Sequence, residues 1–240
     1  MRRVSILFSF LFLISIIQAQ ELGSEELLAR SIAFHDPDGR WEESKLEFVI
    51  KMESADIASR TSRVTIDNGK SEFHLSMING GRVYEFMVDG LDSCEVRVDY
   101  QAPTSFERDS LGLNAARGRR WRDYYGYLYG LPMKLKDPGT VIDPEVINTT
   151  FQGEDVLALK VTYEETVGED IWYFYFSPET YAMVGYRFYH DESINDGEYI
   201  ILTGIEVDRG LRIPKDRAWY TNKEDKLLGV DVMRSMKVSR

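Results

Sequence analysis

Arginines and tyrosines in the segment 117–129 could hold an amphiphilic molecule by its head and its tail. Three of the arginines, Arg119, Arg120 and Arg122, stand in a chain whose net charge is strongly negative. Guanidinium groups bind carboxylates and phosphates in a bidentate manner, and tyrosines supply flat apolar walls that end in a hydroxyl. The alternative is that the arginines form a solvated face that pairs with surplus acids, and that the aromatic side chains are core.

Two histidine clusters could do acid–base or metal chemistry. His35 is followed by Asp36, and His190 is followed by Asp191 and Glu192. If the two clusters met in space, they would form a candidate metal or general acid–base site. A capped turn and a hydrogen-bonded histidine at the end of a strand account for the same residues without catalysis.

Other catalytic patterns are missing from the sequence. It has no glycine-rich phosphate loop, no nucleophile elbow, and no cysteine and histidine pattern with metal-ligand spacing. We therefore expect a binding protein rather than an enzyme, and we expect no metal and no cofactor.

The first nineteen residues have the form of a secretory signal peptide. Arg2 and Arg3 precede the apolar run 4–17, and Ala19 is a small residue at the expected cleavage site. The run is too short to span a bilayer as a helix, and no cysteine follows it for lipid attachment. The sequence therefore predicts a signal peptide over 1–19, one domain over 20–240, and a periplasmic or extracellular location. We expect no transmembrane segment in the mature chain.

Charge and cysteine content restrict the partners and the source of stability. The chain has 29 Lys and Arg against 40 Asp and Glu, a net charge of −11, and loss of Arg2 and Arg3 with the signal peptide makes it −13. Such a surface repels nucleic acid and anionic membranes. Cys94 is the sole cysteine, so no internal disulfide can form and the core must be stabilised by burial. We expect Cys94 to be a half-buried, inert thiol.

The elements that must position these residues are mostly strands. A helix is expected from Ser24, a plausible N-cap, and a second helical pattern covers 110–130. Apolar side chains recur at every second position in ten further segments, namely 46–52, 64–66, 73–77, 84–88, 96–98, 157–163, 172–176, 184–190, 199–205 and 228–232. We count about ten or eleven antiparallel strands. A sheet of this size should curl into an incomplete barrel covered by the two helices.

One of these strands is apolar on both faces. The segment 171–176 has no polar position except through tyrosine hydroxyls. Either protein covers both of its faces, or one face lines a cavity.

Several motifs resemble an uncharacterised family of exported proteins from Bacteroidota. They are FHDPDGRW (34–41), YLYGLPMKLKDPGT (127–140), YRFYHDE (186–192), RIPK (212–215) and AWY (218–220). The order of helix, meander, helical insertion and meander is also similar to the LolA/LolB-like half-barrel of periplasmic lipoprotein carriers. That resemblance implies an apolar concavity beneath the helices that receives acyl chains. Its wall would be formed by Trp172, Phe174, Tyr186 and Phe188, facing Tyr125 and Tyr129.

Three functional hypotheses follow. The first is a carrier that binds a lipid or another amphiphile, with Arg119, Arg120 or Arg122 on the head group. The second is a hydrolase of glycans or esters that uses the two histidine clusters. The third is an assembly module that binds a protein partner through a sheet edge.

Overall fold

The computed structural model describes residues 22–90 and 93–239, so the predicted signal peptide lies outside the described residues. Twelve strands form one antiparallel sheet in the order β5-β4-β3-β2-β1-β12-β11-β10-β9-β8-β7-β6. The strands are β1 (Lys45–Glu53), β2 (Arg60–Asp67), β3 (Glu72–Asn79), β4 (Arg82–Asp89), β5 (Ser93–Val98), β6 (Thr140–Phe151), β7 (Glu154–Tyr163), β8 (Ile171–Phe176), β9 (Met183–Tyr189), β10 (Glu198–Asp208), β11 (Leu211–Thr221) and β12 (Leu227–Ser239).

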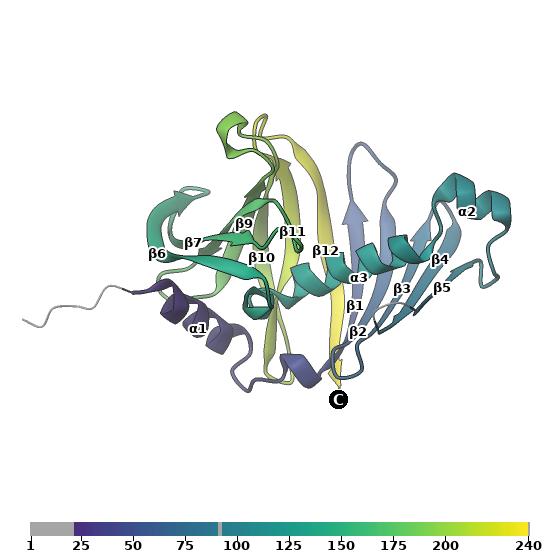
Figure 1. Cartoon of the computed structure of the whole chain (residues 1–240), viewed down its shortest axis with the longest axis horizontal. Helices are drawn as coiled ribbons and strands as arrows, with labels where there is room; N and C mark the ends of the chain where they lie inside the picture. The colour runs from purple at the N-terminus through teal and green to yellow at the C-terminus, as the bar shows by residue number, and fades with distance from the viewer. Residues whose placement is uncertain (1–21, 91–92, 240) are drawn as a thin grey trace, which may run out of the picture.

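The sheet is curved but does not close. Pairing of β1 with β12 joins the first and last strands of the chain, and β5 and β6 remain as the two edges. This arrangement confirms the predicted incomplete barrel (Figure 1).

The strand count is twelve rather than ten or eleven, because β6 and β11 lack a clean alternation. β6 contains Pro144, and its register with β7 shifts between Ile142 and Val146. β11 contains Pro214 and carries Arg217, a charged residue that is 1% exposed. Proline is rare inside a strand, and a charged residue is rarely buried. Neither residue type therefore indicates a buried strand in the sequence.

Three α-helices accompany the sheet. They are α1 (Ser24–His35), α2 (Ser105–Leu111) and α3 (Ala115–Gly130), with the short 3-10 helices η1 (Trp41–Glu43), η2 (Met133–Lys136) and η3 (Glu192–Ile194). The N-cap of α1 is Gly23 rather than the predicted Ser24. The helical pattern over 110–130 is two helices, because Gly112 ends α2 in the left-handed conformation with φ 59°. Within the described residues, no helix is long and apolar enough to cross a membrane.

Helix α3 crosses the concave side of the sheet (Figure 1). Its face toward the sheet buries Tyr125, Leu128 and Tyr129. Gly118 allows the first half of the helix to approach β5, because a Cβ there would lie 2.4 Å from the Cys94 sulfur. Cys94 is half-buried, and burial raises the pKa of its thiol. The interior under α3 is thus a filled core.

The second apolar face of β8 is covered by the chain itself. Phe174 and Phe176 point into the core, whereas Tyr175 points to the opposite face. Phe151, at the end of β6, stacks on the Tyr175 ring with centroids 4.3 Å apart. Gly185 makes room for it, since a Cβ at that position would lie 2.3 Å from the Phe151 ring.

Candidate ligand cavity

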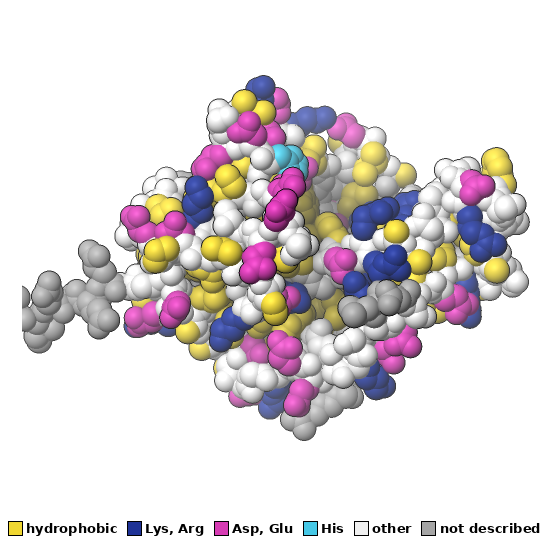
Figure 2. Space-filling view, in the orientation of Figure 1, with side chains coloured by type: hydrophobic (Ala, Val, Ile, Leu, Met, Phe, Trp, Pro, Cys, Tyr) yellow, Lys and Arg dark blue, Asp and Glu magenta, His cyan; other side chains and the backbone are white. Residues whose placement is uncertain are grey.

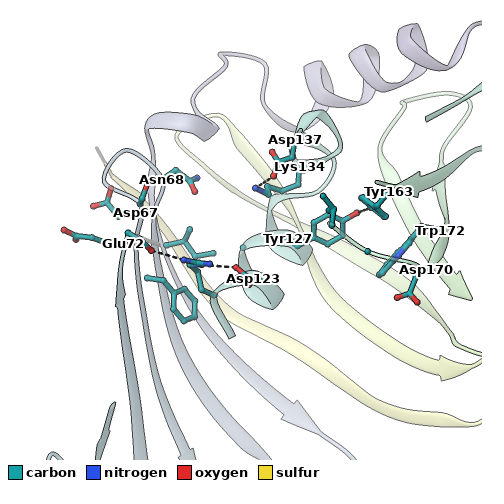
Figure 3. A pocket seen from close by; sticks show the side chains of 18 residues that line it. Asp67, Asn68, Glu72, Asp123, Tyr127, Lys134, Asp137, Tyr163, Asp170 and Trp172 are labelled. Carbon is teal, nitrogen blue, oxygen red and sulfur yellow. Dashed lines mark hydrogen bonds and ion pairs between the residues drawn. The ribbon is translucent and has the colours of Figure 1, made fainter. Parts of the chain in front are cut away.

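A cavity of about 720 Å³ opens beside α3, between the turn that joins β2 to β3 and the loop that joins β7 to β8. Its volume falls within the range of small-molecule sites. Segments far apart in the sequence contribute its walls (Figure 3). They are the 66–73 hairpin, Gly90, the α3 positions 122, 123, 126 and 127, the η2 region, and the 163–172 loop.

Three aromatic side chains form one wall. The Tyr127 ring lies 5.9 Å from the Trp172 ring and 6.3 Å from the Tyr163 ring, in edge-to-face arrangements. The hydroxyls of Tyr127 and Tyr163 are hydrogen-bonded to each other, and the two rings point toward one another in Figure 3. Burial raises the pKa of both tyrosines, that of Tyr163 to about 12, so both are neutral at physiological pH. The wall combines flat apolar surface with neutral polar tips.

Two cationic side chains line the same cavity. Arg122 donates from Nη1 to the Gly90 carbonyl oxygen at 2.9 Å and from Nε to Asp123 at 2.9 Å. Lys134 is paired with Asp137, as Figure 3 shows. A guanidinium has five N–H donors and an ammonium has three, so both groups keep donors beyond those contacts. The cavity can therefore offer hydrogen bonds to an acceptor-rich head group.

The structure brings together only part of the predicted ligand site. Of the three arginines singled out in the sequence, Arg122 lines the cavity, whereas Arg120 is exposed and Arg119 is half-buried outside its lining. Trp172 lines the cavity, and Phe188 stacks on Trp172 with centroids 4.9 Å apart.

The other four predicted wall residues lie in the core. Tyr125 is 1% exposed, and Phe174, Tyr186 and Tyr129 are 0% exposed. Tyr129 and Phe48 are in contact across the core, with centroids 5.0 Å apart. A ligand could reach these four side chains only if α3 moved away from the sheet.

His35 is a buried structural residue in this fold. Its Nδ1 donates to the Arg212 carbonyl oxygen at 2.6 Å, so its Nε2 is unprotonated and accepts from the Met183 N–H at 3.0 Å. Burial lowers the pKa of His35 from 6.5 to about 4. Asp36 accepts hydrogen bonds from the N–H groups of Arg40 and Trp41 and so fixes the turn after α1.

His190 lies in a different setting. It is exposed, and its Nδ1 donates to Asp170 at 2.6 Å, which raises its pKa. Asp191 accepts from the Ser193 N–H, and Glu192 accepts from the Tyr173 hydroxyl at 2.7 Å. The hydrogen-bond partners of the two imidazoles are different residues, and the described part of the chain contains no group of three or more His, Cys, Asp or Glu placed to hold a metal.

Several cavity residues were not singled out as site residues in the sequence. Tyr127, Lys134 and Asp137 lie in the motif 127–140, which signalled the family resemblance but no chemistry. Tyr163 and Asp170 flank a loop and carry no spacing signal. The motif is the one feature that could have drawn attention to this wall.

The sequence matches one known family model. Residues 2–234 match the model of a family of unknown function, DUF6503. The chain belongs to the DUF6503 family. This confirms the predicted membership of a family without an assigned activity, and the bacterial group stays a prediction. No curated protein sequence matches this DUF6503 chain.

One solved structure shares the fold of this DUF6503 protein, and two others are similar to it. A LolA superfamily protein from Nitrosomonas europaea is 11% identical, with 91% of this chain and 94% of that chain covered and a TM-score of 0.52. A putative outer membrane lipoprotein-sorting protein domain from Vibrio parahaemolyticus is 12% identical, with 90% of each chain covered and a TM-score of 0.48. A DUF1329 family protein from Desulfovibrio piger is 11% identical, covers 89% and 92%, and has a TM-score of 0.49. At such identities the likeness shows the fold alone, and at that level the predicted LolA-like resemblance is confirmed.

Proposed function

We propose that this DUF6503 protein is a periplasmic carrier that binds an amphiphilic, lipid-like molecule in the cavity beside α3. The observation that carries the proposal is the cavity itself, in which aromatic and aliphatic side chains lie beside two hydrogen-bonding cations and five carboxylates, Asp67, Glu72, Asp123, Asp137 and Asp170. Small-molecule sites have this character, with mostly apolar linings and a few convergent polar groups.

Each part of the ligand has a matching part of the wall. Val167, which is 55% exposed, and the half-buried Trp172 provide apolar surface for a tail, at which each buried methylene contributes about 0.8 kcal/mol, whereas Ile66 and Phe73 line the cavity but are only 5% and 2% exposed. Arg122 and Lys134, each paired with a carboxylate, keep N–H donors for the phosphate or hydroxyl oxygens of a head group. In this proposal Arg122 takes the head-group role that the sequence predicted for Arg119, Arg120 or Arg122.

The proposed export of the chain is consistent with a carrier role. The proposed signal peptide over 1–19 would deliver the chain to the periplasm, where a lipid needs a protein to cross the aqueous space. In the proposed carrier His35 and Asp36 are structural residues, since both are buried and hydrogen-bond to the backbone.

Substitution of Gly126 tests the site with little risk to the fold. A Cβ at Gly126 would meet nothing within 4 Å, and the residue lines the cavity, so a larger side chain enters open space. The mature protein is incubated with a bacterial lipid extract and re-isolated. Native mass spectrometry then measures the mass of the complex, and the bound lipid is extracted and identified. We expect a bound amphiphile on the unaltered protein and on Gly126→Ala, and loss of most of it from Gly126→Leu.

Two results would contradict the proposal. One is an unaltered protein that binds no lipid and gains no thermal stability from the extract. The other is a Gly126→Leu variant that keeps the full ligand occupancy, which would place the ligand elsewhere.

A further inference from the structure

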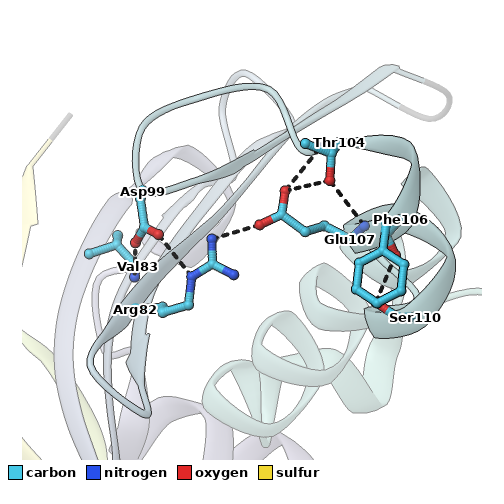
Figure 4. A network of polar contacts seen from close by, with 7 residues as sticks. All are labelled: Arg82, Val83, Asp99, Thr104, Phe106, Glu107 and Ser110. Carbon is cyan, nitrogen blue, oxygen red and sulfur yellow. Dashed lines mark hydrogen bonds and ion pairs between the residues drawn. The ribbon is translucent and has the colours of Figure 1, made fainter.

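Helix α2 is held rigidly at the outer end of the sheet (Figure 4). Thr104 and Glu107 form a reciprocal capping box, and Arg82 of β4 bridges Glu107 at 2.7 Å and Asp99 at 2.8 Å. These hydrogen bonds, first those from Thr104 and then that from Arg82, lower the pKa of Glu107 to about 2. A helix of seven residues is unstable by itself. This network therefore fixes an element that would otherwise fray.

The anchored helix presents apolar side chains to solvent. Phe106 is 77% exposed and Leu111 is 37% exposed. None of the α2 residues is buried, so the helix adds little to the core. Holding α2 in place costs conformational entropy, yet the helix leaves the Phe106 ring in water. This favours a role for α2 outside the core.

Basic residues lie on α2 and on the adjoining part of α3. Arg108 lies on α2, and Arg117, Arg119 and Arg120 lie in the first turns of α3. Figure 2 shows Lys and Arg gathered along α2 and α3, with hydrophobic side chains at the outer end of α2. Asp99, Glu107 and Asp109 are acidic residues of the same corner, and Arg82 pairs with the first two, so the four arginines of α2 and α3 outnumber the acids that Arg82 leaves uncompensated. Since surface potentials are screened within about 8 Å at physiological ionic strength, this corner acts locally even in a chain of net charge −11.

We propose that α2 and the first turns of α3 dock this protein on an anionic lipid bilayer, with Phe106 in the interface and the arginines on lipid phosphates. Phenylalanine and leucine beside basic residues are the composition of interfacial binding segments. A stable protein interface needs about 1,200 Å² of complementary surface, more than two exposed apolar side chains supply. The acidic remainder of the molecule would be repelled by the bilayer, so this corner would face it. The proposal goes beyond lipid carriage and does not depend on it.

Vesicle co-sedimentation tests the docking surface. The probes are vesicles of phosphatidylcholine alone and of phosphatidylcholine mixed with phosphatidylglycerol, at low and high salt. We expect binding to the mixed vesicles only, and its loss at high salt. Each basic residue near such a surface contributes about five-fold to affinity, so the double substitution Arg108→Glu, Arg120→Glu should weaken binding more than about ten-fold. Phe106→Ser should weaken it by about ten-fold.

Matched controls separate docking from misfolding and from lipid carriage. Ile194 is 60% exposed on η3, and Lys223 is exposed in the turn between β11 and β12, so Ile194→Ser and Lys223→Glu should bind vesicles normally. All variants should keep the melting temperature and the ligand occupancy of the unaltered protein. Equal binding to both vesicle types, absence of binding to either, or equal loss from the control variants would overturn the proposal.

Discussion

The two faces of α3 contain the same kinds of side chain in opposite environments. Toward the sheet, Tyr129 is fully buried, and the Arg217 guanidinium lies 3.7 Å from its ring centroid. Toward the cavity, Tyr127 and Arg122 border open space. An aromatic residue beside an arginine is therefore core on one face and candidate ligand site on the other. Residue types alone do not separate the two roles; the position of the helix over the sheet does.

The largest expected effect is a loss of stability from a substitution on the face of α3 that packs against the sheet. Tyr129→Ala should lower the free energy of unfolding by about 3–5 kcal/mol, because it removes a buried ring and leaves a cavity under α3. Tyr129→Phe is the matched control. The Tyr129 hydroxyl has no hydrogen-bond partner among the described residues, so its removal should cost little. Urea denaturation measures both values, and a small effect of Tyr129→Ala would show that this face is not closed core.

The stability of the core should also depend on pH, through the buried His35 at the end of α1. Its pKa is about 4 in the folded state and about 6.5 when unfolded, so the folded state binds fewer protons between these values. Stability should be insensitive to this group above pH 6.5 and should fall by about 3 kcal/mol as the pH drops to 4.

A histidine variant isolates this contribution. His35→Gln should be less stable at neutral pH, with a flatter stability profile between pH 6.5 and 4. Denaturation at several pH values checks this, and a profile that keeps its full slope in the variant would assign the acid sensitivity to other groups.

A pair of glycines on α3 compares the two faces within one helix. In Gly118→Ala the new Cβ would lie 2.4 Å from the Cys94 sulfur, so we expect a loss of about 1–3 kcal/mol. In Gly126→Ala the Cβ meets open space, and the better helix propensity of alanine should add about 0.5–1 kcal/mol. Thermal denaturation of the two variants measures the contrast. Effects of the same sign would mean that the cavity face is packed like the core face.

Much of the architecture could be predicted from local patterns. The alternation in β1 to β5 and in β7 to β10, together with the spacing of Trp121, Tyr124, Tyr125 and Leu128, was sufficient for the curved sheet and the helix on it. β6 and β11 were missed because proline and the buried Arg217 disrupt their patterns.

The candidate site was predictable only in part, because the cavity depends on distant segments. Trp172 and Phe174 have the same parity on β8, so the sequence treats them alike. In the fold, Trp172 at the start of the strand reaches the cavity, whereas Phe174 is fully buried in the core. Tyr163 at the end of β7 and Lys134 in η2 also line the cavity, and no local pattern shows that these two distant segments meet.

Photo-crosslinking tests directly whether the ligand lies against the cavity side of α3 or against the side that packs on the sheet. The mature protein is loaded with a phospholipid that carries a diazirine in its acyl chain, irradiated, digested, and sequenced by mass spectrometry to locate the modified residues. We expect adducts on Tyr127, Val167 or Trp172. Adducts on Phe174 or Tyr186 would show instead that α3 lifts and that the ligand enters the space occupied here by core side chains.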